Sequence, residues 1–572
     1  MVLTVLAAGF LLLTVSNLAQ GRRNLLLVRA NLSAARQALS QRDDVTALAR
    51  LDRASAQLAS ADRAASALPV RALGLVPLVG SPGRALSAAV AAGSEGLAAG
   101  RVIAEASSSF PTSASATVDG HDLGPFHAAA ARSEAAVDEA GRHLAAASAR
   151  LAGPAGAVLP PVSRPAKAMR AEIDAGRLQL SGLVRGLALL GDLTAPDTEV
   201  RLLLLAQDTL ELRATGGFIG SYGILDFSRG TARLTTYRAT EDLPEPSPPL
   251  QAPAGLATYL VRPWNLGNAN WSPDFPVSAA AAAELYRRQG GGEVDGVLAL
   301  TELATARLVG ALGGVKLPSY PAPVQEDGFD LRAVQEVELK RPFDVPRKKF
   351  LIELADVLFT RLFDLPAGKL PAVTDAVRRS ISAGDAQLWF RDATRQNLVA
   401  GTEAAGALPP PDRDFLMVVD ANLTASKANL DTTKQVEYRV ERRGDGRLVA
   451  HVRVEIRNDG VESPINPLYN SYLRVYAPGG SELLDPNLET RQLPRDGPYE
   501  VFGQPLIVGA KARGAVTFDY LLPESVGDGG AYRLTWIRQV GTARDGLRAV
   551  VDGRSFEVDP AGRRLEHEQR LG

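Results

Sequence analysis

Arg and Asp side chains that could bind and transfer a phosphate group occur in three segments of the chain, 210–217, 236–242 and 337–349. The Arg residues are Arg213, Arg238, Arg341 and Arg347, and the carboxylates are Asp242 and Asp344. Guanidinium groups bind phosphate oxygens at two points, and carboxylates bring Mg²⁺ to the same group. These residues predict a diphosphate site in which Asp242 and Asp344 hold Mg²⁺ and act in catalysis. The alternative is that they form separate surface ion pairs.

A fourth segment, 265–276, lies between the second and third of these and is rich in amide side chains. It contains Asn270, which we expect to bind the ligand, and Asp274, a further carboxylate that could reach the metal. The Gly pair at 216–217 follows Arg213, and Gly within a strand marks a bulge or a close approach by a backbone or a ligand. We therefore expect Arg213, Arg238 and Arg347 to face one cleft at the strand ends of an α/β sheet.

Composition excludes several other kinds of site. The chain has no Cys, so disulfides, thiolate zinc sites and cysteine nucleophiles are absent. None of the five His lies between residues 144 and 450, which excludes a Ser-His-Asp triad or a His metal cluster contained in the central domain. With 63 basic and 64 acidic residues the formal charge is −1, which argues against nucleic acid as a partner.

Residues 1–19 carry no charge and are mostly Leu, Val, Ala and Phe. As a helix they would span about 28 Å, close to the thickness of a bilayer core. We expect a single transmembrane anchor over 1–20; a cleaved signal peptide and a buried core helix are the alternatives. Arg22 and Arg23 follow the apolar run, but long domains weigh lightly in the positive-inside rule. We therefore expect the bulk of the chain outside the cytoplasm.

The pattern of apolar residues divides the rest of the chain into three parts. Spacings of three and four predict an Ala-rich helical stalk over 24–195, with helices over 24–68, 83–107, 126–151 and 167–190. Strands over 200–206, 216–225, 232–237 and 294–300 alternate with helices over 278–289, 301–312 and 346–362. This alternation predicts a layered α/β domain over 196–411. We expect the helix 303–312 to pack its apolar side on the strand 294–300.

From residue 412 to 572 the pattern becomes all-β. Short strands are predicted over 415–419, 435–442, 448–457, 471–477 and 515–522, which together indicate a β-sandwich. The fold class that follows is multidomain α+β: a membrane helix and helical stalk, a central α/β layered domain and a C-terminal β-sandwich.

Four phrases in the sequence identify a family. They are Arg213-x-Thr-Gly-Gly-Phe-Ile-Gly, Asn268-Ala-Asn-Trp-Ser-Pro-Asp-Phe-Pro, Val294-Asp-Gly-Val and Asp420-Ala-Asn-Leu-x-x-x-Lys427. Through them the chain from about residue 24 to 440 resembles an uncharacterised bacterial family, number 4012 among the domains of unknown function.

The central domain also resembles, more distantly, the LytR-CpsA-Psr family. The residues that carry this likeness are Val294 to Leu300, Leu308 to Val315 and Lys340-Arg341-x-x-Asp344-x-x-Arg347-Lys348. Those enzymes are membrane-anchored and transfer glycopolymers from polyprenyl-pyrophosphate carriers to the cell wall. Thr215 and Ala239 stand where that family has Asp, so the resemblance implies the fold and an anionic-lipid pocket more directly than the Mg²⁺-assisted reaction.

We therefore expect an extracytoplasmic, membrane-anchored protein of the cell envelope that binds a wall glycan or a polyprenyl-(pyro)phosphate-linked glycan. The transfer reaction that the resemblance implies would make it a glycopolymer phosphotransferase with Mg²⁺. The alternative is a non-catalytic scaffold for envelope assembly. The sequence leaves the substrate, the reaction and the oligomeric state open.

Overall fold

The computed structural model describes residues 2–41, 43–74, 80–111, 113–117, 120–156, 160–259, 263–339, 348–424, 426–484, 489–527, 531–542, 545–558 and 563–570. The chain forms two compact units. Unit 1 comprises Met1–Thr198, Ser228–Thr231 and Phe363–Pro371, and unit 2 comprises Glu199–Phe227, Ala232–Leu362 and Ala372–Gly572.

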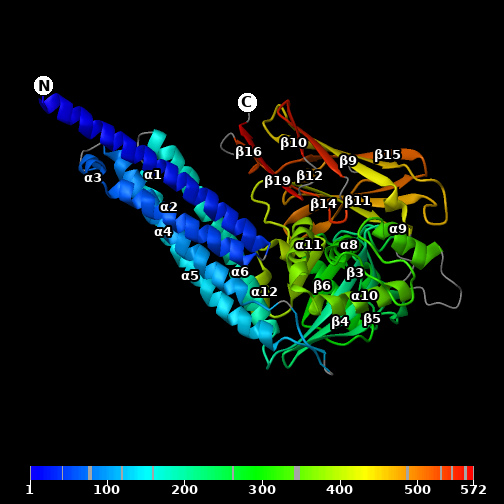
Figure 1. Ribbon diagram of the computed structural model, residues 1–572. Coiled ribbons are helices and arrows are strands. Elements are labelled where there is room, and N and C mark those ends of the chain that lie inside the picture. The colour runs from blue at the N-terminus through cyan, green and yellow to red at the C-terminus, as the bar shows by residue number, and fades with distance from the viewer. Residues whose placement is uncertain are drawn as a thin grey trace. The chain divides into compact units, whose positions relative to one another are not determined.

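Unit 1 is helical, as predicted, and its long helices run side by side (Figure 1). Its helices are α1 (Val2–Ser40), α2 (Asp44–Ser66), α3 (Leu68–Gly74), α4 (Ser81–Ser108), α5 (Gly124–Ala155) and α6 (Pro160–Leu193). A small hairpin, β1 (Ala116–Thr117) and β2 (Gly120–Asp122), precedes α5. The prediction of one helix over 24–68 is wrong, because the Asp43 carboxylate accepts the Thr46 N–H at 2.9 Å and starts a new helix there.

Small residues let the helices of unit 1 approach closely. A Cβ added at Gly93 would lie 2.8 Å from a Leu58 methyl, and one added at Gly100 would lie 3.0 Å from Leu51. Among the helices as far as the structure describes them, none is both long and apolar enough to cross a membrane. The expected anchor over 1–20 lies within α1, where the side chains of residues 2–12 are not described, so it stays a prediction.

The first half of unit 2 is an α/β domain whose sheet has the strand order β5-β4-β3-β6-β7. Its strands are β3 (Glu199–Asp208), β4 (Phe218–Ser228), β5 (Thr231–Ala239), β6 (Gly296–Thr301) and β7 (Ala386–Phe390). Strand β6 is parallel to β3, with Leu202 opposite Gly296, and antiparallel to β7. Its helices are α7 (Phe275–Arg288), α8 (Glu302–Ala311), α9 (Phe329–Val334), α10 (Lys349–Phe363), α11 (Leu370–Ala383) and α12 (Ala393–Val399). The predicted strands and helices are confirmed, whereas α9, α11, β7 and α12 were not predicted.

The expected packing of the helix 303–312 on the strand 294–300 needs correction. Val297 and Ala299 of β6 belong to a core cluster that includes the apolar side of α7. Val309 of α8 is fully buried in a different cluster, together with Phe350 and Leu354 of α10. Val309 of α8 thus packs among residues of α10 and of the segment between α8 and α10, rather than in the cluster that contains Val297 and Ala299.

The second half of unit 2 is the predicted β-sandwich, formed by two six-stranded sheets. One sheet runs β12 (Glu482–Leu483), β15 (Ala512–Leu521), β10 (Leu448–Asn458), β9 (Thr432–Arg442), β17 (Gly546–Val551) and β18 (Arg554–Val558). The other runs β13 (Arg491–Asp496), β14 (Tyr499–Val508), β11 (Tyr469–Pro478), β8 (Asp414–Asn422), β16 (Ala531–Ile537) and β19 (Arg564–Arg570). A shared apolar core includes residues of both sheets.

Strand β8 joins the sandwich to the α/β domain. Its residues Leu416 and Val418 point into the sandwich core, whereas Phe415, Met417 and Val419 belong to a cluster that includes Ala214 of the α/β domain. Every residue of β8 is buried, which explains its continuous apolar run. The α/β domain and the sandwich therefore share a buried interface within unit 2.

Candidate functional site

The Gly-rich segment between β3 and β4 brings the chain back close to itself. A Cβ at Gly217 would lie 1.9 Å from the carbonyl oxygen of Asp208, so only Gly fits there. Gly216 has φ +141°, a conformation that other residues rarely adopt. This tight return, closed by a bond from the Phe218 N–H to the Glu211 carbonyl at 2.8 Å, positions the predicted ligand Arg213.

Arg213 is buried, with 6 % of its surface exposed. Its Nε and Nη2 donate to Asn268 Oδ1 at 3.2 and 3.1 Å, and its Nη1 donates to the carbonyls of Leu212 and Asn422. Burial lowers the pKa of this guanidinium. The side chain thus binds oxygens of the protein itself and links the Gly-rich segment to the end of β8.

Asn270 forms part of a buried polar network beneath the same segment. Its Nδ2 donates to Gln207 Oε1 at 2.7 Å and to the Gly217 carbonyl at 2.8 Å. The Thr215 hydroxyl donates to the same Gln207 oxygen at 2.9 Å. Asn270 and Thr215 therefore hold the Gly-rich segment against β3, and the ligand-binding role of Asn270 stays a prediction.

Lys427 is the central charge of a second buried cluster. Its Nζ lies 2.6 Å from Asp208 Oδ2, 2.5 Å from Glu211 Oε1 and 3.9 Å from Glu338 Oε1. Burial acts to lower the pKa of Lys427, but the charges of Asp208 and Glu211 outweigh it and raise that pKa. Burial and then the charge of Asp208 raise the pKa of Glu302 well above its usual value.

A cleft of about 190 Å³ opens over this cluster. Its polar lining consists of carboxylates, amides and two ammonium groups: Asp208, Glu211, Glu241, Glu245, Asn265, Asn268, Gln289, Lys348 and Lys427. The ring of Phe218 adds an apolar surface. The Lys348 ammonium would lie 3.1 Å from a Cβ at Gly220, so the absence of a side chain at Gly220 makes room for it.

The remaining predicted site residues lie elsewhere. Arg238 at the end of β5 and Asp242 in the 3-10 turn after it are both exposed, and their charges act on the Tyr222 hydroxyl, whose pKa is raised by burial. Neither residue lines the cleft over Lys427. Arg341, Asp344 and Arg347 lie outside the described residues. The structure thus places Arg213 and Asn270 around one Gly-rich segment. Arg238 and Asp242 are exposed and lie in the chain on either side of Glu241, which lines the cleft.

The described carboxylates were compared with what a metal site requires. Within the described part of the chain, no three or more Asp, Glu or His side chains converge as metal ligands. Asp208 and Glu211 bind the Lys427 ammonium, and Asp242 is exposed. The predicted Mg²⁺ stays a prediction, because Asp344, one of its two predicted ligands, lies outside the described residues.

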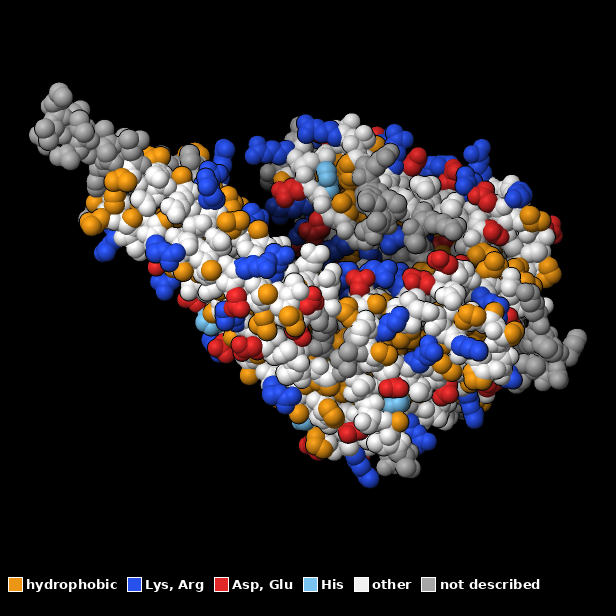
Figure 2. Space-filling view, in the orientation of Figure 1, with side chains coloured by type: hydrophobic (Ala, Val, Ile, Leu, Met, Phe, Trp, Pro, Cys, Tyr) orange, Lys and Arg blue, Asp and Glu red, His pale blue; other side chains and the backbone are white. Residues whose placement is uncertain are grey.

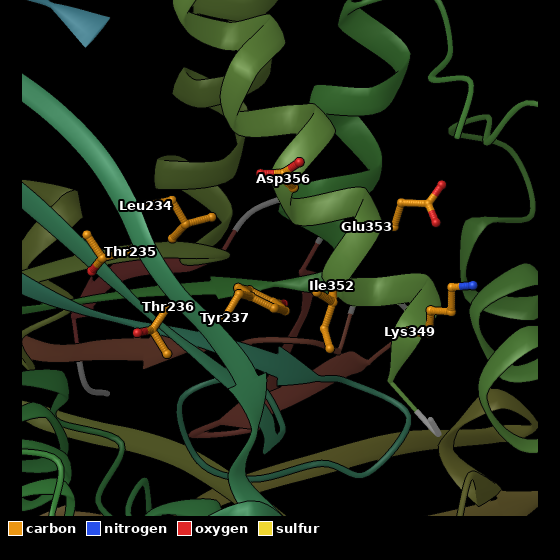
Figure 3. A pocket seen from close by; sticks show the side chains of 8 residues that line it. All are labelled: Leu234, Thr235, Thr236, Tyr237, Lys349, Ile352, Glu353 and Asp356. Carbon is orange, nitrogen blue, oxygen red and sulfur yellow. The ribbon is translucent and has the colours of Figure 1, made fainter. Parts of the chain in front are cut away.

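A further groove of about 390 Å³ lies between β5 and α10. Tyr237 and Ile352 lie toward each other across it, and Lys349 and Glu353 stand at its rim (Figure 3). Burial raises the pKa of Tyr237 to about 12, so this phenol stays protonated. The groove contains none of the predicted site residues.

Sequence reasoning missed the residues that line the cleft, although signals for two of them were present. Asn268 begins one of the family-like phrases and Lys427 ends another. Asp208 and Glu211 stand just before the Gly pair, but nothing local indicates that a Lys more than 200 positions later neutralises them.

The fold and the cleft define a multidomain α+β protein with a polar cleft over a buried lysine–carboxylate cluster. Residues 197–329 match the model of the family described as "Protein of unknown function (DUF4012)", so the predicted resemblance to this family is confirmed over that range. No curated protein and no solved structure matches the chain. The resemblance to the LytR-CpsA-Psr family stays a prediction.

Proposed function

We propose that the chain is a membrane-anchored, extracytoplasmic protein of the cell envelope that binds a glycan, free in the wall or linked to a polyprenyl carrier. The single observation that carries the glycan part is the lining of the cleft over Lys427. The membrane anchor and the extracytoplasmic location rest on the apolar residues 1–19 and on the resemblance to LytR-CpsA-Psr enzymes. We also propose that the central domain has the α/β fold of those enzymes.

The cleft offers the groups that sugars need. Carboxylate oxygens accept hydrogen bonds from hydroxyls, and amides both donate and accept them. Arg213 holds Asn268 Oδ1, which fixes the orientation of this amide. Its Nδ2 has no partner among the described residues and is left for a ligand.

The charges of the cleft favour the sugar over the diphosphate of a lipid carrier. Four carboxylates face two ammonium groups there, and Asp208 and Glu211 already bind Lys427. A bare diphosphate would be repelled by Glu241 and Glu245, whereas sugar hydroxyls donate to them. On the visible face of the molecule, basic and acidic side chains are interspersed rather than gathered in one basic patch (Figure 2).

Binding is better supported than transfer. The transfer reaction needs the metal-binding carboxylates Asp242 and Asp344, of which the first is exposed and the second lies outside the described residues. We therefore propose that the cleft over Lys427 recognises a glycan, and we propose no catalytic reaction there. The second candidate function is a non-catalytic scaffold. It is favoured by the buried hydrogen bond from Arg213 to the Asn422 carbonyl of β8, which connects the α/β domain to the sandwich.

The binding test compares two exposed Glu residues in the purified full chain. Glu245 lines the cleft, and Glu199 lies at the other end of β3 from Asp208. Isothermal titration against defined wall oligosaccharides should show that Glu245→Ala weakens binding roughly tenfold to a hundredfold, the effect of one charged hydrogen bond, while Glu199→Ala leaves it unchanged.

Two results would contradict the glycan site: no oligosaccharide binds, or both variants bind as the unaltered chain does. Binding of a sugar-free prenyl pyrophosphate without any oligosaccharide binding would also contradict it. Topology is tested separately, by adding protease to intact protoplasts. Digestion beyond about residue 25 is expected, and complete protection would overturn the extracytoplasmic location.

A further inference from the structure

A pocket of about 230 Å³ lies where the α/β domain meets the β-sandwich inside unit 2. The α/β domain contributes Trp264 and Trp271, and the sandwich contributes Arg474, Tyr476 and Asp496. It shares no lining residue with the cleft over Lys427. Since ligand pockets for drug-sized molecules measure about 300–1,000 Å³, this one suits a single ring with a few substituents.

Arg474 gives the pocket a buried positive charge. Only 1 % of its surface is exposed, and burial lowers its pKa. Its Nη2 donates to the Trp271 carbonyl at 2.7 Å, and its Nη1 donates to the Tyr476 hydroxyl at 3.1 Å. Among the described residues, no carboxylate lies within 4.0 Å of the guanidinium, and Nε has no hydrogen-bond partner.

A buried guanidinium without a carboxylate costs free energy that an anion in the pocket would recover. Arg213 is also buried, but four donated bonds to protein oxygens occupy it. Arg474 makes only two such bonds, and its third neighbour is the Trp271 ring, 3.8 Å from the guanidinium carbon. The charge of Arg474 is therefore the less satisfied of the two.

The rest of the lining indicates what carries the anion. The indole of Trp264, and the part of Trp271 that Arg474 does not cover, offer flat apolar surface to a ring. Asp496 accepts the Tyr476 O–H at 2.9 Å and, as a carboxylate, has further lone pairs for hydroxyl donors. A ligand with both a carboxylate and hydroxyls satisfies Arg474 and Asp496 together, whereas a purely anionic one would be repelled by Asp496.

We infer that this pocket binds a sugar ring that carries a carboxylate, with the carboxylate toward Arg474, the ring against the two Trp residues and hydroxyls donating to Asp496. The inference stands on residues that the glycan cleft does not contain, so either site can fail without the other.

The test is isothermal titration of the purified full chain with D-glucuronate, D-glucose and benzoate. Glucuronate has the carboxylate and the hydroxyls, glucose lacks the carboxylate, and benzoate lacks the hydroxyls. We expect glucuronate to bind roughly tenfold to a hundredfold more tightly than either of the others, the effect of one charged hydrogen bond. Equal affinity for glucose would overturn the role of Arg474, and equal affinity for benzoate would overturn the sugar.

Two exposed Ala residues provide a blocking variant and its control. Ala254 lines the pocket, and Ala280 lies on α7 outside it. Ala254→Trp should abolish glucuronate binding, and Ala280→Trp should preserve it. Arg474→Gln should remove the preference for glucuronate over glucose if the variant folds. If the unaltered chain binds no glucuronate, or if Ala254→Trp binds it as tightly as the unaltered chain does, the inference is wrong. The pocket would then be a packing defect at the interface between the α/β domain and the sandwich.

Discussion

Replacing Lys427 by Met removes the positive charge from the buried cluster while keeping a side chain of similar length. Lys427 belongs to the loop after β8 and is 7 % exposed. Of its two closest partners, Asp208 is the last residue of β3 and Glu211 lies three residues further on. The variant leaves both carboxylates in place without their cation. The ion pairs of Lys427 with Asp208 and Glu211 connect the β-sandwich to the α/β domain. Losing them should therefore lower the free energy of unfolding of unit 2.

Breaking a buried ion pair by removing one partner costs about 3–5 kcal/mol. With an m value of about 3 kcal/mol per molar urea, the midpoint of unfolding should fall by roughly 1–1.7 M. The pH dependence has a definite sign. Burial acts to raise the pKa of Asp208, and Lys427 is the largest of the influences that lower it, with Lys348 and Glu302 adding smaller ones. Removing Lys427 therefore raises that pKa above its value in the unaltered chain. A carboxylate with a raised pKa regains stability as pH falls through that pKa, so the deficit of Lys427→Met should shrink from pH 7 toward pH 4.

Tryptophan fluorescence reports on this unit alone, because all four Trp residues of the chain lie in unit 2. Urea titrations of the full chain at pH 7, 5 and 4 should be run beside Lys316→Met, which removes an exposed Lys from the same domain and should leave the midpoint unchanged. An unchanged midpoint for Lys427→Met at pH 7, or a deficit that does not vary with pH, would refute the buried ion pair.

Three further predictions concern stability. Burial raises the pKa of Asp414 from 3.8 to about 6, although the Tyr438 hydroxyl donates a hydrogen bond to this carboxyl. The folded state therefore holds a proton at Asp414 that the unfolded state has released, and the free energy of unfolding that this proton adds below pH 4 is lost as pH rises through 6. Asp414→Asn should therefore remove about 3 kcal/mol of pH dependence between pH 4 and 8 in urea unfolding; parallel curves for variant and wild type would count against this. Val309→Asp puts an unpaired charge into the fully buried contact between α8 and α10 and should cost about 4 kcal/mol or more; an unchanged melting temperature would be inconsistent with that packing. Gly217→Ala forces a methyl onto the Asp208 carbonyl and should lower the melting temperature, whereas Gly444→Ala, with no atom near its Cβ, should not, and equal effects would disprove the close approach.

Much of the secondary structure could be predicted from local patterns. The alternation in β9, where inward residues such as Val436 and Tyr438 are separated by exposed ones, is visible in the sequence because one face of that strand meets the core. Strands β13 and β19 were not predicted, because they have no face that is buried in the core. Strand β13 has no buried residue and includes Pro494, and β19 alternates charged and half-buried residues, so neither has an apolar pattern.

The sites depend on contacts between distant residues, which residue types do not reveal. Arg213 was predicted as a phosphate ligand from its type and the Gly pair that follows, but the carbonyl of Asn422, 209 positions later, is one of its acceptors. Lys427 was noted in the sequence only as the last residue of a family-like phrase, and its ion pairs with Asp208 and Glu211 are known only from the structure.

By itself the sequence determined the helical first part, the α/β alternation, the β-sandwich and the family of residues 197–329, because each follows from periodicity or from short phrases. Only the tertiary structure decided that β8 is buried on both faces and that Arg474 meets Trp271 across the join of the two domains. The physical reason is that burial and charge pairing are properties of the assembled interface. A guanidinium that is exposed, paired or buried without a carboxylate is the same residue in the sequence, and only its surroundings decide whether it stabilises the fold or binds a ligand.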